Sequence, residues 1–493
     1  MGAISAIRTN EGTDAIPLLI DLIKSQIHRG NDLFGVTTQQ ETLFTEDLSE
    51  LNELQSTRSA IAYNLMRLQP TDLPQPRTSK GRSIIVESDY TDFGGTFDEL
   101  LEYLSEETPE KTLARFVSEF DGQYALAVLS NGEIFAARDP VGLKPLYYCS
   151  EGNLSAVSTE SKGLWRLGVR NTLIFPPGHL WKLQPKHPPW PIRQITPSNT
   201  MRGETTEISE RLGKLLHKSI SERTRGFKRV GVSFSGGLDS SITAYLLSQL
   251  EIETCAFIVG VKGHPATEWA KRSAELLGIK AETKEYELDQ IEDQLKKCLW
   301  RIEEANQVKL GVSIPLSLCA KLTESCGVMN VFTGQGADEL FAGYHGFLSV
   351  LKQGGERALE EAIFQRVLDA HKDSYQACEQ ATAPERVKML HPFADWELIT
   401  YGLSIPVSMK IESPNDGLRK RILRKACRDL GLPKKLADTP KKAIQYSTGV
   451  DKSIETLAKS RGFRTEDYLR RLFMDIFKDP IWNRPAYACL DEK

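Results

Sequence analysis

The feature that most constrains the fold of this chain is a glycine turn, Ser235-Gly236-Gly237-Leu238-Asp239-Ser240-Ser241. A short apolar run, residues 230–234, precedes the turn and predicts a buried strand. Residues 239–250 follow with apolar side chains at helical spacing. Small residues let the backbone approach an anion closely, and a helix N-terminus stabilises negative charge. The turn therefore predicts phosphate binding; the alternative is a plain strand-to-helix turn with an Asp or Ser cap.

The residues of the turn indicate which type of phosphate-binding site it forms. The turn lacks the lysine of the Gly-x-x-x-x-Gly-Lys-Ser/Thr loop that holds the outer phosphates for phosphoryl transfer. Asp239 would repel phosphates unless a cation lay between them. We therefore expect Mg²⁺ beside Asp239, with a nucleoside triphosphate as the ligand.

A second glycine turn follows another predicted strand, residues 328–333, and reads Gly334-Gln335-Gly336-Ala337-Asp338-Glu339. In a parallel sheet both turns lie beyond the carboxyl ends of strands, where ligands bind. Asp239 and Asp338 are then expected to hold one Mg²⁺ from two sides. The alternative is that Asp338 and Glu339 only complement the dipole of the next helix. We also place Val259, in the strand expected over residues 254–261, among the nucleotide-binding residues.

A proline-rich stretch, residues 185–197, divides the chain and predicts an extended connector. Upstream, short apolar runs predict strands at residues 83–86, 124–128, 134–137 and 146–148, and helical spacing predicts helices at residues 17–27 and 96–104. Downstream, helices expected at residues 208–220, 239–250 and 268–277 alternate with the strands already named. This alternation predicts a parallel sheet covered on both faces, followed by a mostly helical part from residue 354.

Composition limits the class of protein. The chain has 493 residues, too many for one ordinary domain, and its 40% hydrophobic and 26% charged residues are typical of globular proteins. A net charge of −4 disfavours nucleic acid as a partner. No long apolar stretch or N-terminal leader stands out, so we expect a cytoplasmic protein with no membrane association. The eight cysteines show no zinc-site spacing, and a transition metal is not expected.

The two turns resemble those of the asparagine synthetase family and, more distantly, of the β-lactam synthetases. Further points of resemblance are the string from Arg138 to Tyr148, Pro177-Gly178-His179, Ser313-Ile314-Pro315, Pro392-Phe393-Ala394-Asp395 and Lys441-Lys442-Ala443-Ile444-Gln445-Tyr446. The resemblance implies two domains. Residues 1–190 would form an α+β, glutaminase-like αββα sandwich of the N-terminal nucleophile hydrolase type. Residues 200–493 would form an α/β parallel-sheet synthetase domain with a helical C-terminal part.

The resemblance also implies an activity. The C-terminal domain would bind ATP and Mg²⁺, and a substrate carboxylate would attack the α-phosphate and release pyrophosphate. Ammonia or an amine would then displace AMP. A lysine over the adenylate would stabilise developing negative charge; Lys442 is the first choice and Lys441 the second, because the spacing to Tyr446 differs from that of the family. Gln335 would contact the substrate.

The chain departs from the family at its N-terminus. Glutamine-using members begin Met-Cys-Gly-Ile, and the exposed cysteine is the nucleophile. Here Gly2 takes that place, and Ser5 is not terminal. The Asn-Gly-Glu substrate string is replaced by Glu87-Ser88-Asp89, although His28-Arg29-Gly30-Asn31-Asp32 keeps a family-like sequence. We therefore predict that the N-terminal domain does not hydrolyse glutamine.

A second departure concerns the substrate. Asparagine synthetases carry Glu where this chain has Gln335, and β-lactam synthetases carry Tyr; a neutral amide cannot form the ion pair that a carboxylate can. Ammonia-dependent asparagine formation is the first hypothesis. Adenylation of a different acid, or a catalytically silent regulatory partner, are the alternatives. The expected partners are a small carboxylate, ammonia or an amine, and in addition a separate glutaminase and a second copy of the chain.

Overall fold

The computed structural model describes residues 1–69, 72–88, 93–169, 171–185, 187–440 and 448–478. These residues form two compact units. The N-terminal unit comprises Met1–Gln194, the short segment Leu299–Ala305 and the described residues from Arg470 onward. The C-terminal unit comprises Ile195–Cys298 and Asn306–Leu469.

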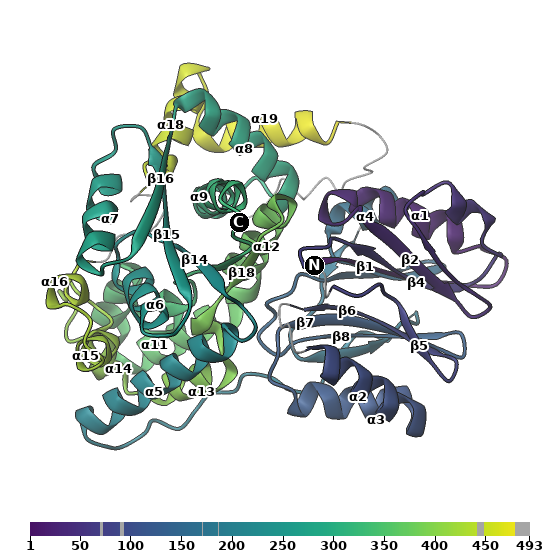
Figure 1. Cartoon of the computed structure of the whole chain (residues 1–493), viewed down its shortest axis with the longest axis horizontal. Helices are drawn as coiled ribbons and strands as arrows, with labels where there is room; N and C mark the ends of the chain where they lie inside the picture. Colours follow the sequence, from purple (N-terminus) through teal and green to yellow (C-terminus); the bar gives the residue numbers. More distant parts are fainter. Residues whose placement is uncertain (70–71, 89–92, 170, 186, 441–447, 479–493) are drawn as a thin grey trace. The chain divides into compact units, whose positions relative to one another are not determined.

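The N-terminal unit is built on two antiparallel sheets (Figure 1). The seven-stranded sheet has the order β11 (Leu173–Ile174), β9 (Tyr147–Glu151), β10 (Leu154–Ser158), β1 (Gly2–Thr9), β4 (Ser59–Leu65), β2 (Leu33–Thr38), β3 (Thr42–Thr45). The six-stranded sheet has the order β13 (Trp190–Pro191), β12 (His179–Lys182), β8 (Glu133–Arg138), β7 (Tyr124–Ser130), β6 (Arg82–Ser88), β5 (Arg77–Ser79). Helices α1 (Ile16–Ser25) and α4 (Ser161–Arg166) cover the first sheet, and α2 (Phe93–Glu106) and α3 (Pro109–Glu119) cover the second.

Strand β7 shows why this sandwich forms. All of its residues are buried, and successive side chains point to opposite faces. Ala125, Ala127 and Leu129 join the core between the two sheets. Tyr124 and Val128 join the separate core beneath α2 and α3. A strand that is apolar on both faces needs a layer on each side, so the αββα prediction is confirmed.

The C-terminal unit contains a five-stranded parallel sheet in the order β16 (Lys280–Tyr286), β15 (Glu253–Val261), β14 (Arg229–Ser233), β17 (Asn330–Phe332), β18 (Lys388–Leu390). The α-helices described from residue 205 onward are α5 (Thr205–Arg223), α6 (Leu238–Ser248), α7 (Pro265–Leu276), α8 (Leu288–Ile302), α9 (Gln307–Ser325), α10 (Ala337–Leu340), α11 (Gly346–Ala370), α12 (Gln376–Thr382), α13 (Trp396–Ser404), α14 (Val407–Lys410), α15 (Arg421–Asp429), α16 (Lys434–Ala437), α18 (Val450–Ser460) and α19 (Thr465–Ile476). The end of α8 and the part of α19 from Arg470 onward belong to the N-terminal unit. The α/β prediction is confirmed.

Two strands of this sheet were not predicted. Strand β16 lies at an edge and buries only Tyr286 fully, so it has no apolar run. Strand β18 is three residues long and lies in the region predicted to be helical from residue 354. The part from residue 354 is mostly helical, as predicted, and β18 is an exception that the sequence did not indicate, because three buried residues are too few to show a period of two.

The proline-rich connector is extended, as predicted, and part of it belongs to a sheet. Its residues Trp190–Pro191 form β13, which pairs with β12 at a sheet edge. Proline is tolerated there because an edge strand need not donate every amide proton. Among the described residues, no helix is long and apolar enough to cross a membrane.

The order of the parallel strands fixes where a ligand can bind. From β14 the chain moves outward to β15 and β16 on one side, and later to β17 and β18 on the other. The connections therefore diverge beyond the carboxyl ends of β14 and β17, which is where ligands bind in sheets of this kind. Both glycine turns lie at this switch point.

Candidate functional site

The first glycine turn joins β14 to α6. Gly236 has φ of 68°, and a Cβ atom there would lie 2.8 Å from Oγ of Ser273 and 3.0 Å from the Trp269 ring. The indole nitrogen of Trp269 donates to the carbonyl of Gly236 at 3.0 Å. Gly237 is the N-cap of α6. Only glycine therefore fits at position 236, and the turn presents its backbone at the positive end of a helix.

Serine hydroxyls line the same turn. The amide of Ser235 donates to Oγ of Ser240 at 3.3 Å, and the amide of Gly237 donates to Oγ of Ser235 at 3.4 Å. Ser241 is fully buried, and its Oγ has no hydrogen-bond partner in the described part of the chain. A buried hydroxyl without a partner is rare in a folded protein and is consistent with a ligand contact.

The second turn packs directly on the first. A Cβ atom on Gly334 would lie 2.6 Å from Cβ of Asp239, so a larger residue would push the turns apart. Gly336 has φ of 93°, and a Cβ atom there would lie 2.6 Å from the Tyr375 hydroxyl. The next acidic residue, Glu339, is buried; burial and the charge of Asp338 raise the pKa of its carboxyl.

Asp239 and Asp338 meet at one point. Nζ of Lys420 lies 2.7 Å from Oδ1 of Asp239 and 2.7 Å from Oδ1 of Asp338. The Lys420 side chain is 0% exposed, whereas the two carboxylates are 14% and 16% exposed. The carboxylates are thus close enough to share one cation. Two partly exposed carboxylates that converge on one point match the way in which proteins hold Mg²⁺ with a nucleotide, so these residues fit that ion.

Lys420 was not among the residues predicted for the site. One local signal points to it: Arg419, Lys420 and Arg421 stand at the start of α15, where positive charge opposes the helix dipole. Three positive charges at the positive end of a helix are stabilised only if acidic side chains lie nearby. Only the fold shows that the partners follow β14 and β17.

Of the other residues predicted for the site, Gln335 and Val259 lie within the described part of the chain. Gln335 has a side-chain amide whose oxygen and nitrogen are both buried without a hydrogen-bond partner among the described residues. Val259 lies in β15 opposite Lys284 and packs against a small apolar core cluster. Lys441 and Lys442 lie outside the described residues.

In the N-terminal unit, the place expected for the nucleophile has no room for a side chain. A Cβ atom on Gly2 would lie 2.1 Å from the Asn64 carbonyl oxygen and 2.6 Å from the Tyr63 ring. The Tyr63 hydroxyl donates to Glu87 at 2.5 Å, and Nζ of Lys144 lies 3.4 Å from Glu87. Burial opposes ionisation of Glu87, but the positive charges of the α-amine and Lys144 hold its pKa below the usual value. A buried tyrosine and ion pair thus occupy the surroundings of Gly2.

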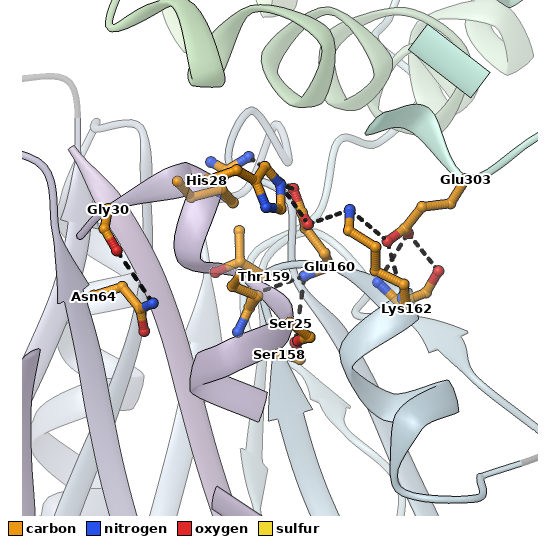
Figure 2. A network of polar contacts seen from close by, with 12 residues as sticks. Ser25, His28, Gly30, Asn64, Ser158, Thr159, Glu160, Lys162 and Glu303 are labelled. Carbon is orange, nitrogen blue, oxygen red and sulfur yellow. Dashed lines mark hydrogen bonds and ion pairs between the residues drawn. The ribbon is translucent and has the colours of Figure 1, made fainter. Parts of the chain in front are cut away.

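A second buried polar network lies in the same unit (Figure 2). Nε2 of His28 lies 3.0 Å from the Glu160 carboxylate, and Lys162 pairs with both Glu160 and Glu303. Glu303 also accepts the first two backbone amides of α4, each at 2.9 Å. Burial, partly opposed by Glu160, lowers the pKa of His28 to about 4, so the imidazole is neutral. The network anchors the segment Leu299–Ala305 and caps a helix.

Together, the αββα sandwich, the parallel sheet and the paired turns at its switch point define a two-domain nucleotide-binding synthetase. The family model of asparagine synthase matches residues 211–357 and 351–480, and the glutamine amidotransferase domain model matches residues 92–166. The chain belongs to the asparagine synthase family. It is accordingly an ATP-dependent ligase that forms carbon–nitrogen bonds, as the sequence resemblance implied.

Curated relatives span most of the chain. A Methanocaldococcus jannaschii protein assigned as a glutamine-hydrolysing asparagine synthetase is 26% identical over 98% of this chain and 99% of its own length. Asparagine synthetase 3 of Arabidopsis thaliana is 27% identical over 72% of this chain and 63% of its own length. A solved glutamine phosphoribosylpyrophosphate amidotransferase from B. subtilis is 15% identical, with a TM-score of 0.33 over 57% of this chain and 65% of that one.

Proposed function

We propose that the C-terminal unit activates a carboxylic acid as its adenylate and transfers ammonia or an amine to it. The observation that carries this proposal is the meeting of Asp239 and Asp338 at one cation-binding point, on two turns at the switch point of a parallel sheet. The first turn has no lysine to hold the outer phosphates for their transfer. The site therefore suits cleavage between the α- and β-phosphates.

The reaction has two steps. A carboxylate oxygen of the substrate attacks the α-phosphorus of ATP; the bond to the β-phosphate breaks, and pyrophosphate leaves. The nitrogen of ammonia or an amine then attacks the acyl carbon; the bond to AMP breaks, and the nitrogen loses a proton. Both steps move negative charge onto phosphate oxygens, which preorganised donors stabilise.

Residues of the two turns supply these donors. The backbone amides at the start of α6 and the Ser241 hydroxyl, which has no partner among the described residues, would hold phosphate oxygens. Asp239 and Asp338 would hold Mg²⁺, which when bound neutralises charge on the leaving pyrophosphate. By family resemblance Lys442, or else Lys441, stabilises the adenylate; both lie outside the described residues.

Aspartate, giving asparagine with ammonia, is the first candidate for the acid. Gln335 favours a second candidate, a different acid, because both of its buried amide atoms lack partners among the described residues. A neutral amide offers one donor and one acceptor face to a substrate and forms no ion pair with a substrate ammonium group. The acid recognised best would then present a neutral polar group at this point.

The structure of the N-terminal unit limits which molecule can donate the nitrogen. The crowding at Gly2 and the buried ion pair of Glu87 and Lys144 support a unit that does not hydrolyse glutamine. Free ammonia, a substrate amine, or ammonia from a separate glutaminase would replace that supply. The unit would then serve as a structural partner of the synthetase.

The test is ATP-dependent release of pyrophosphate, screened over candidate acids with ammonium or amines and with the AMP product measured in parallel. Equal amounts of AMP and pyrophosphate that depend on one acid would support adenylation. Release with aspartate would select asparagine formation, and release with another acid alone would select the second candidate.

Two results would contradict the proposal. Formation of ADP and phosphate would mean cleavage of the outer phosphate bond. Absence of ATP binding, together with absence of pyrophosphate release for every acid, would favour a catalytically silent regulatory protein.

A further inference from the structure

The Lys420 side chain lies between Asp239 and Asp338, and its contacts are unusual for a lysine. Its ammonium is completely buried and reaches both carboxylates at 2.7 Å. It therefore occupies the point where the two carboxylates would otherwise hold a divalent cation. An ammonium and a divalent cation cannot share this point, because like charges repel.

The backbone that carries Lys420 is strained. Arg419 and Lys420 have φ of 53° and 51°, a conformation that residues other than glycine rarely adopt. Two such residues in succession persist only where the surrounding structure enforces them, and such strain is concentrated at functional sites.

A network of side chains enforces this conformation. Oδ1 of Asp416 accepts the backbone amides of Leu418 and Arg419 at 3.0 and 3.1 Å. The buried Arg424 donates to the carbonyls of Leu418 and Arg419 at 2.7 and 2.8 Å. Arg424 also donates to the Thr439 carbonyl at 3.0 Å. The loop before α15 is therefore fixed on both sides and directs Lys420 toward the turns.

The segment that follows α10 is shaped to admit this lysine. A Cβ atom on Gly343 would lie 1.9 Å from Oδ1 of Asp338 and 2.3 Å from Cε of Lys420. The preceding residue, Ala342, also has a positive φ, 58°. The absence of a side chain at position 343 is thus what gives Lys420 its path to the carboxylates.

We propose that Lys420 is the resident counter-cation of the nucleotide-free site and that it exchanges partners when nucleotide binds. Without nucleotide, its ammonium holds the side chains of Asp239 and Asp338 close together. With a nucleotide and its divalent cation bound, Asp239 and Asp338 would hold the cation, and the Lys420 ammonium would move to a phosphate oxygen. This inference rests on the proposed function of the same site, since it needs a nucleotide bound with a divalent cation.

The exchange has a physical reason. Two carboxylates held close together without a cation repel each other. A buried lysine prevents this and keeps the site assembled, while its positive charge weakens the binding of a free divalent cation. Phosphates bring the negative charge that the ammonium needs once it leaves the carboxylates. Metal and nucleotide should therefore bind together rather than separately.

The experiment measures Mn²⁺ binding to the full-length protein by electron paramagnetic resonance and calorimetry, first without nucleotide. Wild-type protein is compared with Lys420→Met, which keeps the length of the side chain and removes the charge. The control is Lys425→Met, the same change on an outward position of α15 where Lys425 pairs with Asp429. We expect Lys420→Met to bind Mn²⁺ about tenfold or more tightly than wild type, and Lys425→Met to match wild type.

A second measurement adds a non-hydrolysable ATP analogue. Wild type should then bind Mn²⁺ much more tightly than without the analogue, and this gain should be at least about tenfold smaller in Lys420→Met. Unchanged Mn²⁺ affinity of Lys420→Met, with normal nucleotide binding by wild type, would overturn the role of Lys420 alone. Failure of wild type to bind the analogue at all would instead overturn the proposed function.

Circular dichroism and thermal unfolding check that Lys420→Met is folded. If it is not, a crystal structure of wild type with Mn²⁺ and the analogue decides the question. Lys420 displaced from both carboxylates and in contact with a phosphate would support the exchange. Lys420 still bridging Asp239 and Asp338, with the metal bound elsewhere, would overturn it.

Discussion

Gly343 lies so close to Lys420 that a single added carbon would collide with the lysine, since the Cβ position is 2.3 Å from Cε. We expect Gly343→Ala to displace Lys420 or Asp338 and to lower pyrophosphate release about 10- to 100-fold, because small misplacements at a reacting site are costly. Pyrophosphate release under saturating ATP measures the effect.

The matched control for this change is Gly346→Ala, since a Cβ atom at Gly346 would meet nothing within 4 Å. Gly346 is the first residue of α11, where alanine favours the helix. Activity of Gly346→Ala should equal that of wild type. Equal activity of Gly343→Ala would show that the collision is relieved without disturbing the site.

Removal of either carboxylate tests the cation site. Asp239→Ala and Asp338→Ala should each lower pyrophosphate release by about 100-fold or more, because charge on the leaving group is then poorly neutralised. Both variants should stay folded, since these side chains are partly exposed. Circular dichroism is measured beside turnover. Normal turnover of either variant would show that the metal assignment is wrong.

A change at Gln335 should alter the choice of acid. Gln335→Glu places a carboxylate where both amide atoms are now buried without partners among the described residues. It should raise kcat/KM for aspartate relative to the best acid of the wild type by about tenfold, because the new charge can pair with a substrate ammonium group. The control Gln249→Glu adds the same charge at an exposed position after α6. An unchanged ratio would remove Gln335 from the acid site.

Restoring a thiol at position 2 should not restore glutamine hydrolysis. Gly2→Cys would force Cβ into the Asn64 carbonyl, 2.1 Å away, and should destabilise the N-terminal unit by about 2 kcal/mol. Glutamate release and the thermal unfolding midpoint measure the two effects. Ser150→Cys, an exposed thiol on β9, controls for the thiol itself. Glutaminase activity in Gly2→Cys would contradict the described packing.

Lys410 gives the protein a pH-dependent stability. Burial lowers the pKa of Lys410 from 10.5 to about 7, while Glu360 partly opposes the shift. The unfolded chain therefore binds a proton that the folded chain releases between these two values. The free energy of unfolding therefore decreases as the pH falls from 10.5 to about 7. The full stability that Lys410 allows is reached only at high pH, where the lysine is neutral in both the folded and the unfolded chain.

The test compares urea unfolding of wild type and Lys410→Met at pH 7 and pH 9. Wild type should gain about 2 kcal/mol more than Lys410→Met on going from the lower to the higher pH. The variant should also be the more stable of the two at pH 7, because it buries no charge. Parallel pH dependence of the two proteins would show that Lys410 keeps an ordinary pKa.

The strands and helices near the nucleotide turn could be predicted from sequence because their signals are local. The apolar run that became β14 and the helical spacing that became α6 each need only a few neighbouring residues. Strand β18 could not be predicted, because its three residues are defined by pairing with β17. A pairing partner distant in sequence leaves no local pattern.

The same contrast holds for the site and for the N-terminal unit. The sequence alone pointed to both glycine turns, to their acidic residues and to the absence of a thiol at Gly2. Backbone freedom, charge and the absence of a thiol are properties of single residues. The fold alone decided that Lys420 meets Asp239 and Asp338, and that Tyr63 and Asn64 close the space beside Gly2. Such contacts join segments far apart in the chain, and they depend on the order in which strands pair rather than on any local preference.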